Sequence, residues 1–460
     1  MRYAWILLLS SVLFAGCGKQ AVQLAEGWTP PVKVTDSQNA LDGGGDLYKW
    51  HDRLILMNER QDWVPHSSIC SSSTCSMLIR NNDSSNAWTQ LPAIQVSGYY
   101  AFYCPTFDIA NDRIMFQGGR VDDNQLQISV VFVRMTASHG IQIEPEKKWT
   151  TDAKTLFGGS QSVDVRLTER PGTSGRLYLG TGIIYGSSLY FPCCVDGFTY
   201  NQAGVAISRG PNMNGVFHSA DSGSTWQIER ISDFDSFTPT ACGTKGSYYY
   251  FATGIIGVKH GFTLWFSRKS VEDSSWEKPK ELKKTIPSGV DARYIATTED
   301  DTVHLVWLDN RHTKWRFTLE GPVFEDCEVA YCHRKDADTT WTKDAILSKG
   351  ILDSYAPCVS VEGDKIVVAW SGNQTDRACP WERDPNDIYY TTSKDGGKTW
   401  AKPLQVTDVA KDGITAGHPQ IAVQNGVIHL LYTQGKEDPQ LQVSNQGPWP
   451  VYYQQRPFPN

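Results

Sequence analysis

The sequence predicts an all-β fold in which small sheets repeat around a closed ring. Three observations predict it: a tight turn that occurs twice, many short strand-like runs, and an N-terminal segment that matches the last strand of a repeat unit. The runs are rich in β-branched and aromatic residues and are bounded by Gly, Asp, Asn and Pro, as strands are. None of them keeps the 3.6-residue period of an amphipathic helix.

The repeated turn spans eight residues and reads S-x-D-x-G-x-T-W, at Ser219–Trp226 and Ser393–Trp400. Its Asp can accept backbone N–H bonds within the turn, and its Gly can adopt a positive φ at no steric cost. Its Trp can pack on the neighbouring sheet at the base of the next strand. These structural positions are Asp221, Gly223 and Trp226 in the first copy and Asp395, Gly397 and Trp400 in the second.

On this turn the chain resembles the sialidase-like (BNR) β-propeller superfamily, whose Asp-box has the same pattern. The resemblance implies a β-propeller made of four-stranded blades. It also implies that the turns lie away from the ligand face, so they indicate the fold and not the function.

The number of blades follows from the tryptophans that end each unit. Counting them predicts seven units of roughly 60 residues, with six as the alternative because sialidases themselves have six blades. The marker residues are Trp28, Trp88, Trp149, Trp226, Trp276, Trp341 and Trp400.

The two ends of the chain are expected to meet in one blade. Gly417–Tyr432 repeats the opening of the preceding unit, Tyr355–Trp370, while Trp28–Asp36 lines up with Trp400–Asp408. We therefore expect the N-terminal strand to complete the last blade and remove an exposed sheet edge.

The first residues have the features of a lipoprotein signal peptide, predicted at 1–16. An apolar run precedes Leu13-Phe14-Ala15-Gly16-Cys17, which resembles a bacterial lipobox and implies lipidation of Cys17. The alternative is ordinary secretion with Cys17 unmodified. Gly18 after the cysteine is typical of lipoproteins sent to the outer membrane. We expect a tether at 17–27, the propeller at 28–460, and an anchor that does not cross the membrane.

The other ten of the eleven cysteines predict disulfide bonds, because their number is even and the chain is expected to be exported. The candidate pairs are Cys70–Cys75, Cys358–Cys379 and a vicinal Cys193–Cys194 pair, the last within an expected insertion at Tyr185–Ala203. A metal site at Cys327, Cys332 and His333 stays open as an alternative.

The net charge of -7 and pI of 5.8 argue against a nucleic-acid partner, because no basic stripe is present. We expect no cofactor and no metal. The expected partners are a glycan or protein ligand on the loop face and the membrane through the lipid, with the protein a monomer.

The candidate site lies on the loops that follow the second strand of each blade, because these share one face of a propeller. Guanidinium groups there would suit an anionic sugar or a peptide carboxylate, although each could instead pair with an acid on the rim. An exposed tryptophan could stack on a sugar, or belong to a structural loop. The ligand-binding candidates are Arg60, Arg120, Asp309, Arg311, Asn373 and Trp381.

Two functions remain open from the sequence. The first is binding of a surface glycan or protein partner by a cell-envelope lipoprotein. The alternative is a divergent sialidase-like exo-glycoside hydrolase that acts on acidic glycans. The chain has no Arg-Ile-Pro tripeptide and no Tyr–Glu pair or Asp that can be matched by motif. Its catalytic residues, if any, are therefore unknown.

Overall fold

The computed structural model describes part of the chain in detail. The described residues are 23–37, 46–50, 53–63, 70–80, 87–97, 106–108, 112–122, 125–136, 141–152, 155–156, 164–166, 177–200, 206–233, 236–255, 262–284, 294–297, 301–309, 315–318, 321–324, 327–351, 353–373, 386–436 and 449–459. The predicted signal peptide and Cys17 lie outside them.

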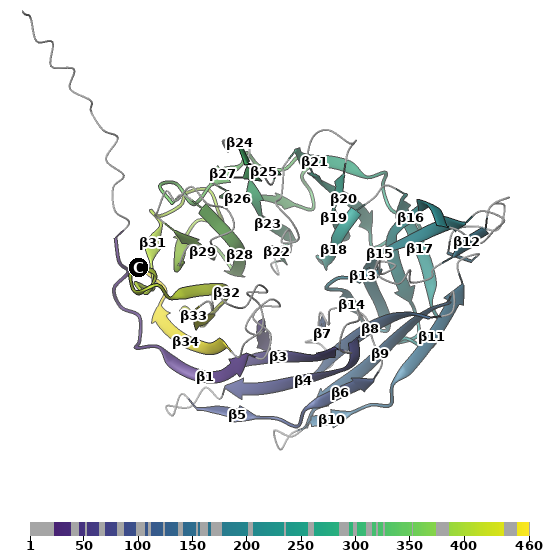
Figure 1. Ribbon diagram of the computed structural model, residues 1–460, viewed down its shortest axis with the longest axis horizontal. Helices are drawn as coiled ribbons and strands as arrows, with labels where there is room; N and C mark the ends of the chain where they lie inside the picture. Colours follow the sequence, from purple (N-terminus) through teal and green to yellow (C-terminus); the bar gives the residue numbers. More distant parts are fainter. Residues whose placement is uncertain are drawn as a thin grey trace, which may run out of the picture.

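The described strands form seven sheets arranged as blades around a ring, which confirms the propeller and the count of seven (Figure 1). Blade 1 contains β2 (Asp46–Trp50), β3 (Arg53–Trp63), β4 (Cys70–Arg80), β5 (Trp88–Gln90) and β6 (Ile94–Ser97). Blade 2 contains β7 (Thr106–Asp108), β8 (Arg113–Asp122), β9 (Gln125–Met135), β10 (Ile141–Ile143) and β11 (Lys147–Asp152). Blade 3 contains β12 (Asp164–Arg166), β13 (Leu177–Leu179), β14 (Ile183–Tyr185), β15 (Ser188–Tyr200), β16 (Ala206–Ser219) and β17 (Gln227–Ser232).

The remaining blades follow the same plan. Blade 4 contains β18 (Ser236–Gly243), β19 (Ser247–Ile255), β20 (Phe262–Ser270) and β21 (Lys280–Lys284). Blade 5 contains β22 (Tyr294–Thr297), β23 (Thr302–Asp309), β26 (Glu328–Lys335) and β27 (Ala345–Ile346), with a separate hairpin of β24 (Trp315–Thr318) and β25 (Gly321–Phe324). Blade 6 contains β28 (Asp353–Glu362), β29 (Lys365–Asn373), β30 (Asp387–Ser393) and β31 (Leu404–Gln405). Blade 7 contains β32 (Thr415–Gln424), β33 (Val427–Gly435), β34 (Trp449–Pro457) and β1 (Val32–Ser37).

The ring closes as predicted from the two ends of the sequence. β1 pairs antiparallel with β34, with Val32 opposite Tyr453 and Ser37 opposite Trp449. Just before β1, the backbone N–H of Ala25 donates to the carbonyl of Gln405 in blade 6 at 2.6 Å. The N-terminal segment therefore contacts two neighbouring blades.

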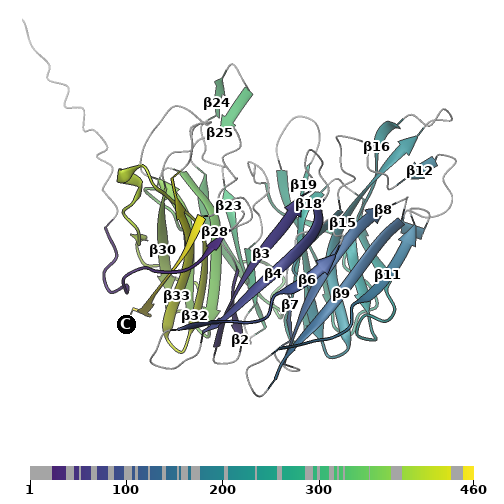
Figure 2. The same cartoon turned by 60° about the horizontal axis from the view of Figure 1, so that its bottom comes forward.

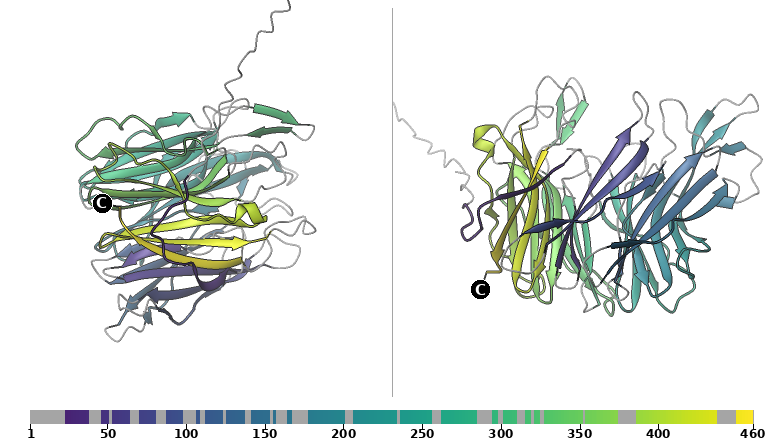
Figure 3. Two further views of the ribbon diagram at one scale, coloured as in Figure 1. Left: turned by 90° about the vertical axis from the view of Figure 1, so that its left-hand side faces the viewer. Right: turned by 90° about the horizontal axis from the view of Figure 1, so that it is seen from below.

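The hydrophobic core lies in the seams between blades. Each of the seven buried clusters of the described residues combines side chains of two adjacent sheets. The cluster between blades 6 and 7, for example, contains Ile388 and Tyr390 from one blade and Val423 and Leu430 from the other. Figure 3 shows these neighbouring sheets stacked side by side. Each blade thus buries both faces against its neighbours.

The two S-x-D-x-G-x-T-W turns have the hydrogen bonds that their residues predict. The carboxylate of Asp395 accepts the backbone N–H of Thr399 at 2.9 Å and its hydroxyl at 2.6 Å. The hydrogen bonds from Thr399, together with one from Ser393, lower the pKa of Asp395 to about 2. In the other copy, hydrogen bonds from Thr225 likewise lower the pKa of Asp221.

The tryptophans of most units pack on the preceding blade. Trp400 of blade 6 meets the ring of Tyr331 in blade 5, with ring centroids 4.7 Å apart. Trp28 meets Tyr390 at 5.4 Å, and Trp88 meets Tyr453 at 5.5 Å. Trp149 departs from this rule, because it packs on Phe217 of the following blade.

The predicted disulfides are wrong for the described cysteines, none of which forms a disulfide bond. Cys70 and Cys75 lie on one extended strand, β4, so their Cα atoms are about 16 Å apart; a disulfide needs less than about 7 Å. Cys193 and Cys194 follow one another in β15, so their side chains point to opposite faces of the sheet.

The third candidate pair was Cys358–Cys379, of which the structure describes only Cys358, as a free cysteine. The thiol of Cys358 is buried and donates to the carbonyl of Ala369 at 3.6 Å, and Cys379 lies outside the described residues. The expected insertion at Tyr185–Ala203 is wrong too. That segment contains the whole of β15, which pairs with β16 over most of its length.

Candidate functional site

The second strands of the blades run toward one end of the ring, here called the loop end, where each connects to the third strand. The hairpin β24–β25 projects at this end (Figure 2). The opposite end, here called the turn end, carries the turns between first and second strands and the two S-x-D-x-G-x-T-W turns.

The predicted site residues are distributed over four blades at the loop end. Arg60 lies in β3 opposite Thr74, and Arg120 lies in β8 opposite Gln127; the side chains of both are outside the described part. Asp309 is the last residue of β23, and Asn373 is the last residue of β29. Arg311 and Trp381 lie outside the described residues. The shared arginine cluster therefore stays a prediction.

Asn373 belongs to a group of polar side chains in the seam between blades 6 and 7. Ser371 lies opposite Ile388, whose side chain packs into the cluster shared with blade 7. Asn373 is two residues further along the same strand and so faces the same way. Asn386 immediately precedes β30. It continues the antiparallel pairing of β29 with β30 by one residue and so lies opposite Asn373.

Three oxygen atoms of this group have no hydrogen-bond partner among the described residues: Ser371 Oγ, Asn373 Oδ1 and Asn386 Oδ1. We call them the seam oxygens. Their residues are 0 %, 7 % and 2 % exposed. Buried polar groups in native proteins are nearly always paired, so each such group needs an explanation, such as a bound water or ligand. Ser354, on the opposite face of blade 6, also has a buried hydroxyl without a partner in the described part of the chain.

Blade 7 supplies the other wall of the seam. The backbone N–H of Ala416 donates to the carbonyl of Asn386 at 2.8 Å. A Cβ atom added to Gly417 would lie 4.0 Å from Ser371 Oγ and 3.8 Å from Thr433 Oγ1. The Thr433 hydroxyl itself donates to the carbonyl of Gly417 at 3.0 Å. Blade 7 thus brings the bare backbone of Gly417 close to one of the seam oxygens, Ser371 Oγ.

The innermost strands of these two blades carry strained backbone at matching positions. Ala356 in β28 has φ 46°, and His418 in β32 has φ 49°. Each precedes a proline, and each lies at a bulge where the strand register shifts. Non-glycine residues in such conformations persist only where the surroundings enforce them, and they gather at functional sites. Tyr355 and His418 are both half-buried there.

A buried carboxyl holds the connection that crosses from blade 6 to blade 7. One oxygen of Asp387 accepts from the Thr407 hydroxyl and the Val409 N–H, both at 2.8 Å, and the other accepts from Gln405 at 3.1 Å. Burial raises the pKa of Asp387, although these hydrogen bonds oppose it. Asp387 therefore has a positioning role at the edge of the seam.

A second polar cluster locks blade 3 to blade 4 near the turn end. Glu229 accepts two hydrogen bonds from Lys269, both at 2.8 Å, and one from Trp276 at 2.8 Å, and it lies 3.0 Å from His218. Burial opposes ionisation of Glu229, but its partners His218 and Lys269 outweigh burial and lower its pKa. The carboxylate oxygens of Glu229 already accept these hydrogen bonds. The cluster is therefore an ion pair that joins blade 3 to blade 4.

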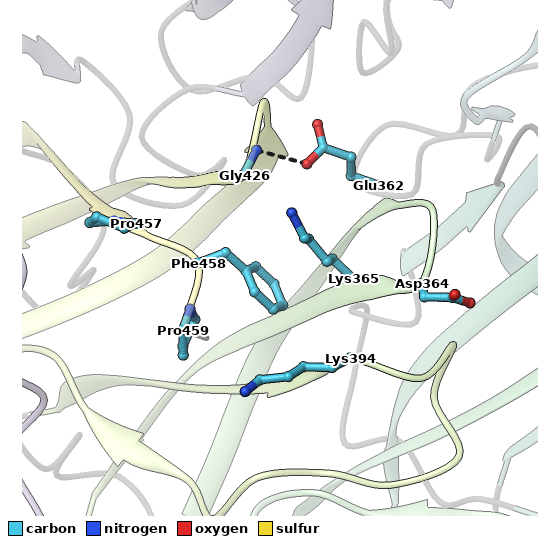
Figure 4. Close-up of a pocket in the computed structure, with 8 residues that line it drawn as sticks. All are labelled: Glu362, Asp364, Lys365, Lys394, Gly426, Pro457, Phe458 and Pro459. Atoms are coloured by element: carbon cyan, nitrogen blue, oxygen red, sulfur yellow. Dashed lines mark hydrogen bonds between the residues drawn. The ribbon is translucent and has the colours of Figure 1, made fainter.

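A cavity of about 450 Å³ opens at the turn end between blades 6 and 7 (Figure 4). Glu362 accepts the N–H groups of Asn425 and Gly426 in its wall, at 2.5 and 2.9 Å. The ammonium group of Lys365 lies 5.8 Å from the ring of Phe458. The cavity lies at the opposite end of the blades from the seam oxygens.

The described residues contain no cluster of three or more His, Cys, Asp or Glu side chains suited to a metal ion. The alternative metal site at Cys327, Cys332 and His333 is thus not supported. Within the same part of the chain, no helix has the length and apolar character needed to span a membrane.

Comparisons with known proteins give similarity only at the level of solved structures. No protein-family model and no curated protein matches the sequence. A Trypanosoma rangeli sialidase in complex with sialic acid is similar over 94 % of this chain, with 10 % identity and a TM-score of 0.47. The chain spans 59 % of that sialidase's length. The NanB sialidase from Streptococcus pneumoniae is similar over 93 % of this chain and 71 % of its own, with 10 % identity and a TM-score of 0.45.

Sequence reasoning named Asn373 but missed Asn386, Asp387 and His418. One signal was present: Ala356-Pro357 and His418-Pro419 occupy matched positions in the two aligned repeats. A residue before proline avoids the right-handed helical region. A repeated X-Pro inside an innermost strand therefore indicates a bulge.

Proposed function

We propose that the protein is a cell-envelope lipoprotein whose propeller binds a surface glycan at the loop end of blades 6 and 7. The observation that carries the proposal is the pair of strained residues, Ala356 and His418, beside the unpartnered seam oxygens. Amide and hydroxyl groups are suited to the hydroxyls of a sugar. A protein partner is the other occupant that this face could take.

A glycan array probed with the full chain tests the proposal, with Asn373→Ala as the variant. We expect at least one glycan to be retained and its affinity to fall about tenfold in the variant, because an amide group of the proposed site is lost. Asn425→Gly, at an exposed position of the turn end whose φ of 52° glycine adopts without strain, is the control and should bind as the original chain does. If no glycan is retained, the proposal is wrong and a protein ligand becomes the first candidate.

A glycoside hydrolase acting on acidic glycans is the second candidate. The positions of Arg60 in β3 and Arg120 in β8 support it, since both second strands run to the loop end. Incubation with a fluorogenic sialoside and a panel of uronic-acid glycosides tests it. Turnover that disappears in Arg120→Ala would establish the hydrolase, and the absence of turnover on every substrate would exclude it for these glycans.

A further inference from the structure

The hairpin β24–β25 of blade 5 projects beyond the blade sheets at the loop end (Figures 2 and 3). Among the described strands, β24 and β25 pair only with each other. A two-stranded hairpin is marginally stable in water unless it packs against something else. The hairpin is therefore suited to a partner outside the seven blade sheets.

The register of the hairpin divides its residues into two unlike faces, because residues directly opposite each other share a face and alternate along each strand. The first face contains only apolar residues, paired as Trp315 with Phe324 and Phe317 with Pro322. The second face contains the pairs Arg316 with Val323 and Thr318 with Gly321. Three of the four residues of the first face are aromatic, and Trp is enriched where proteins meet the interface of a bilayer.

The described chain begins at the same end of the neighbouring blade. The backbone N–H of Gln405 donates to the carbonyl of Gln23 at 3.0 Å. The side-chain amide of Gln405 donates to Asp387, the loop-end residue of β30, at 3.1 Å. Residues 17–22, the part of the proposed tether before Gln23, span at most about 20 Å. A lipid on Cys17 would therefore hold this edge of blade 6 within about 20 Å of the bilayer surface.

We propose that β24–β25 is a membrane-contacting hairpin, whose apolar face enters the interfacial layer of the bilayer that holds the lipid of Cys17. The proposal rests on the lipid anchor of the proposed function. A lipid surface fits better than a soluble protein, because the short tether keeps blade 6, and the hairpin of the adjacent blade 5, beside the bilayer. Lipid and hairpin then fix the propeller at two points, so that the loop end, with the proposed glycan site, faces the membrane.

Hydrogen exchange of the lipidated full chain tests this contact. The chain is reconstituted in vesicles of phosphatidylethanolamine and phosphatidylglycerol alone, and the Cys17→Ala chain in vesicle-free buffer is the unbound reference. We expect the amides of residues 315–324 to exchange at least about threefold more slowly on vesicles. The amides of Asn425 and Gly426, at the turn end, should exchange equally in both samples. Equal exchange of residues 315–324 in both samples would overturn the proposal.

Two double variants compare the faces of the hairpin. Trp315→Ser with Phe317→Ser removes two aromatic residues from the apolar face and should abolish the protection by vesicles. Arg316→Gln with Val323→Ser changes the other face, is the matched control and should keep the protection. Both should melt as the original chain does, because the hairpin pairs with no other described strand. Equal protection in the two double variants would contradict the assignment of the faces.

Brominated lipid tests whether Trp315 itself enters the bilayer. Bromine on shallow acyl positions should quench part of the tryptophan fluorescence of the lipidated full chain. Trp315→Phe should remove that quenching but keep the protection from exchange, since Phe retains an apolar ring on the same face. Quenching that persists in Trp315→Phe would exclude the contact at Trp315.

Two further outcomes separate this proposal from its premise. Protection of residues 315–324 that requires envelope proteins or glycans in the vesicles would assign the hairpin to a different partner and overturn the proposal. A full chain that partitions into water and carries no lipid would overturn the lipid anchor, and the membrane contact with it; this partition is measured before any exchange experiment.

Discussion

Gly397 shows how a single residue of the repeated turn joins two blades. Its φ is 88°, and a Cβ atom there would lie 2.3 Å from the hydroxyl of Tyr331 in the preceding blade. Gly223 has the same relation to Val130, at 2.9 Å. The glycine is therefore needed for its conformation and for close packing between blades.

Gly397→Ala should destabilise the protein far more than Gly350→Ala. Both glycines have φ 88°, but a Cβ atom at Gly350 would meet nothing within 4 Å. The left-handed conformation alone costs about 1–2 kcal/mol, and the clash with Tyr331 adds about 1–3 kcal/mol. Thermal unfolding of the two variants measures the difference. Equal melting temperatures would show that the turn does not dock on blade 5 as described.

Two buried histidines repeat one arrangement in blades 5 and 7. His304 Nδ1 lies 2.6 Å from the Tyr331 hydroxyl, and His429 Nδ1 lies 2.7 Å from the Tyr453 hydroxyl. Burial lowers the pKa of both to about 3, helped by His333 in the first case and Arg80 in the second. Each pair lies under the tryptophan of the next blade, so both histidines stay neutral inside a seam.

The lowered pKa values of these two histidines predict that the folded protein loses stability in acid. The unfolded chain gains a proton on each below about pH 6.5, whereas the folded chain does not until about pH 3. Stability should therefore fall as the pH drops from 6.5 toward 3, with a slope of about 1.4 kcal/mol per pH unit for each histidine. His429→Asn keeps a polar atom near Tyr453 but cannot titrate. Urea unfolding of this variant should show a slope smaller by that amount, and an unchanged slope would contradict the assignment.

At the scale of elements, β1 is the strand on which the ring depends. It covers the edge of β34, and the segment just before it bonds to Gln405 in blade 6. Removing residues 23–37 should expose that edge, lower the melting temperature and cause association between chains. A synthetic peptide of the same residues, added in trans, should restore the melting temperature, while a scrambled peptide should not. An unchanged melting temperature in the truncated chain would contradict the closure.

The sequence predicted elements well where the signal was local and repeated. The two turns, the closing strand and the seven tryptophans are local patterns, and the structure confirms the ring that they indicate. From the sequence we predict an insertion at Tyr185–Ala203, where the structure has β15. It is a strand because β16 and three short strands pair with it, which is a tertiary effect that overrides local propensity.

The candidate site was predictable only in part for the same reason. Asn373 could be named because it ends a strand at the loop end. Ser371 and Asn386 are buried by blade 7, which begins some 40 residues later in the sequence than Ser371. No local sequence pattern therefore reveals that these two residues are buried. The disulfide prediction failed because the spacing of cysteines does not show that two of them share one strand.

At the scale of the whole molecule, we propose that the propeller is tethered by a lipid on Cys17, which lies outside the described residues. Expressed in a Gram-negative host, the full chain should partition into the detergent phase of a detergent–water separation and incorporate labelled palmitate. Cys17→Ala should move it to the aqueous phase and abolish the label, because one thioether-linked lipid is the only anchor proposed. Gly18→Asp is the informative control: it should keep the label, since the cysteine remains, but shift the protein from outer-membrane to inner-membrane fractions on a density gradient. Aqueous partition of the original chain would exclude the lipid anchor, and an unshifted Gly18→Asp would exclude the role given to Gly18.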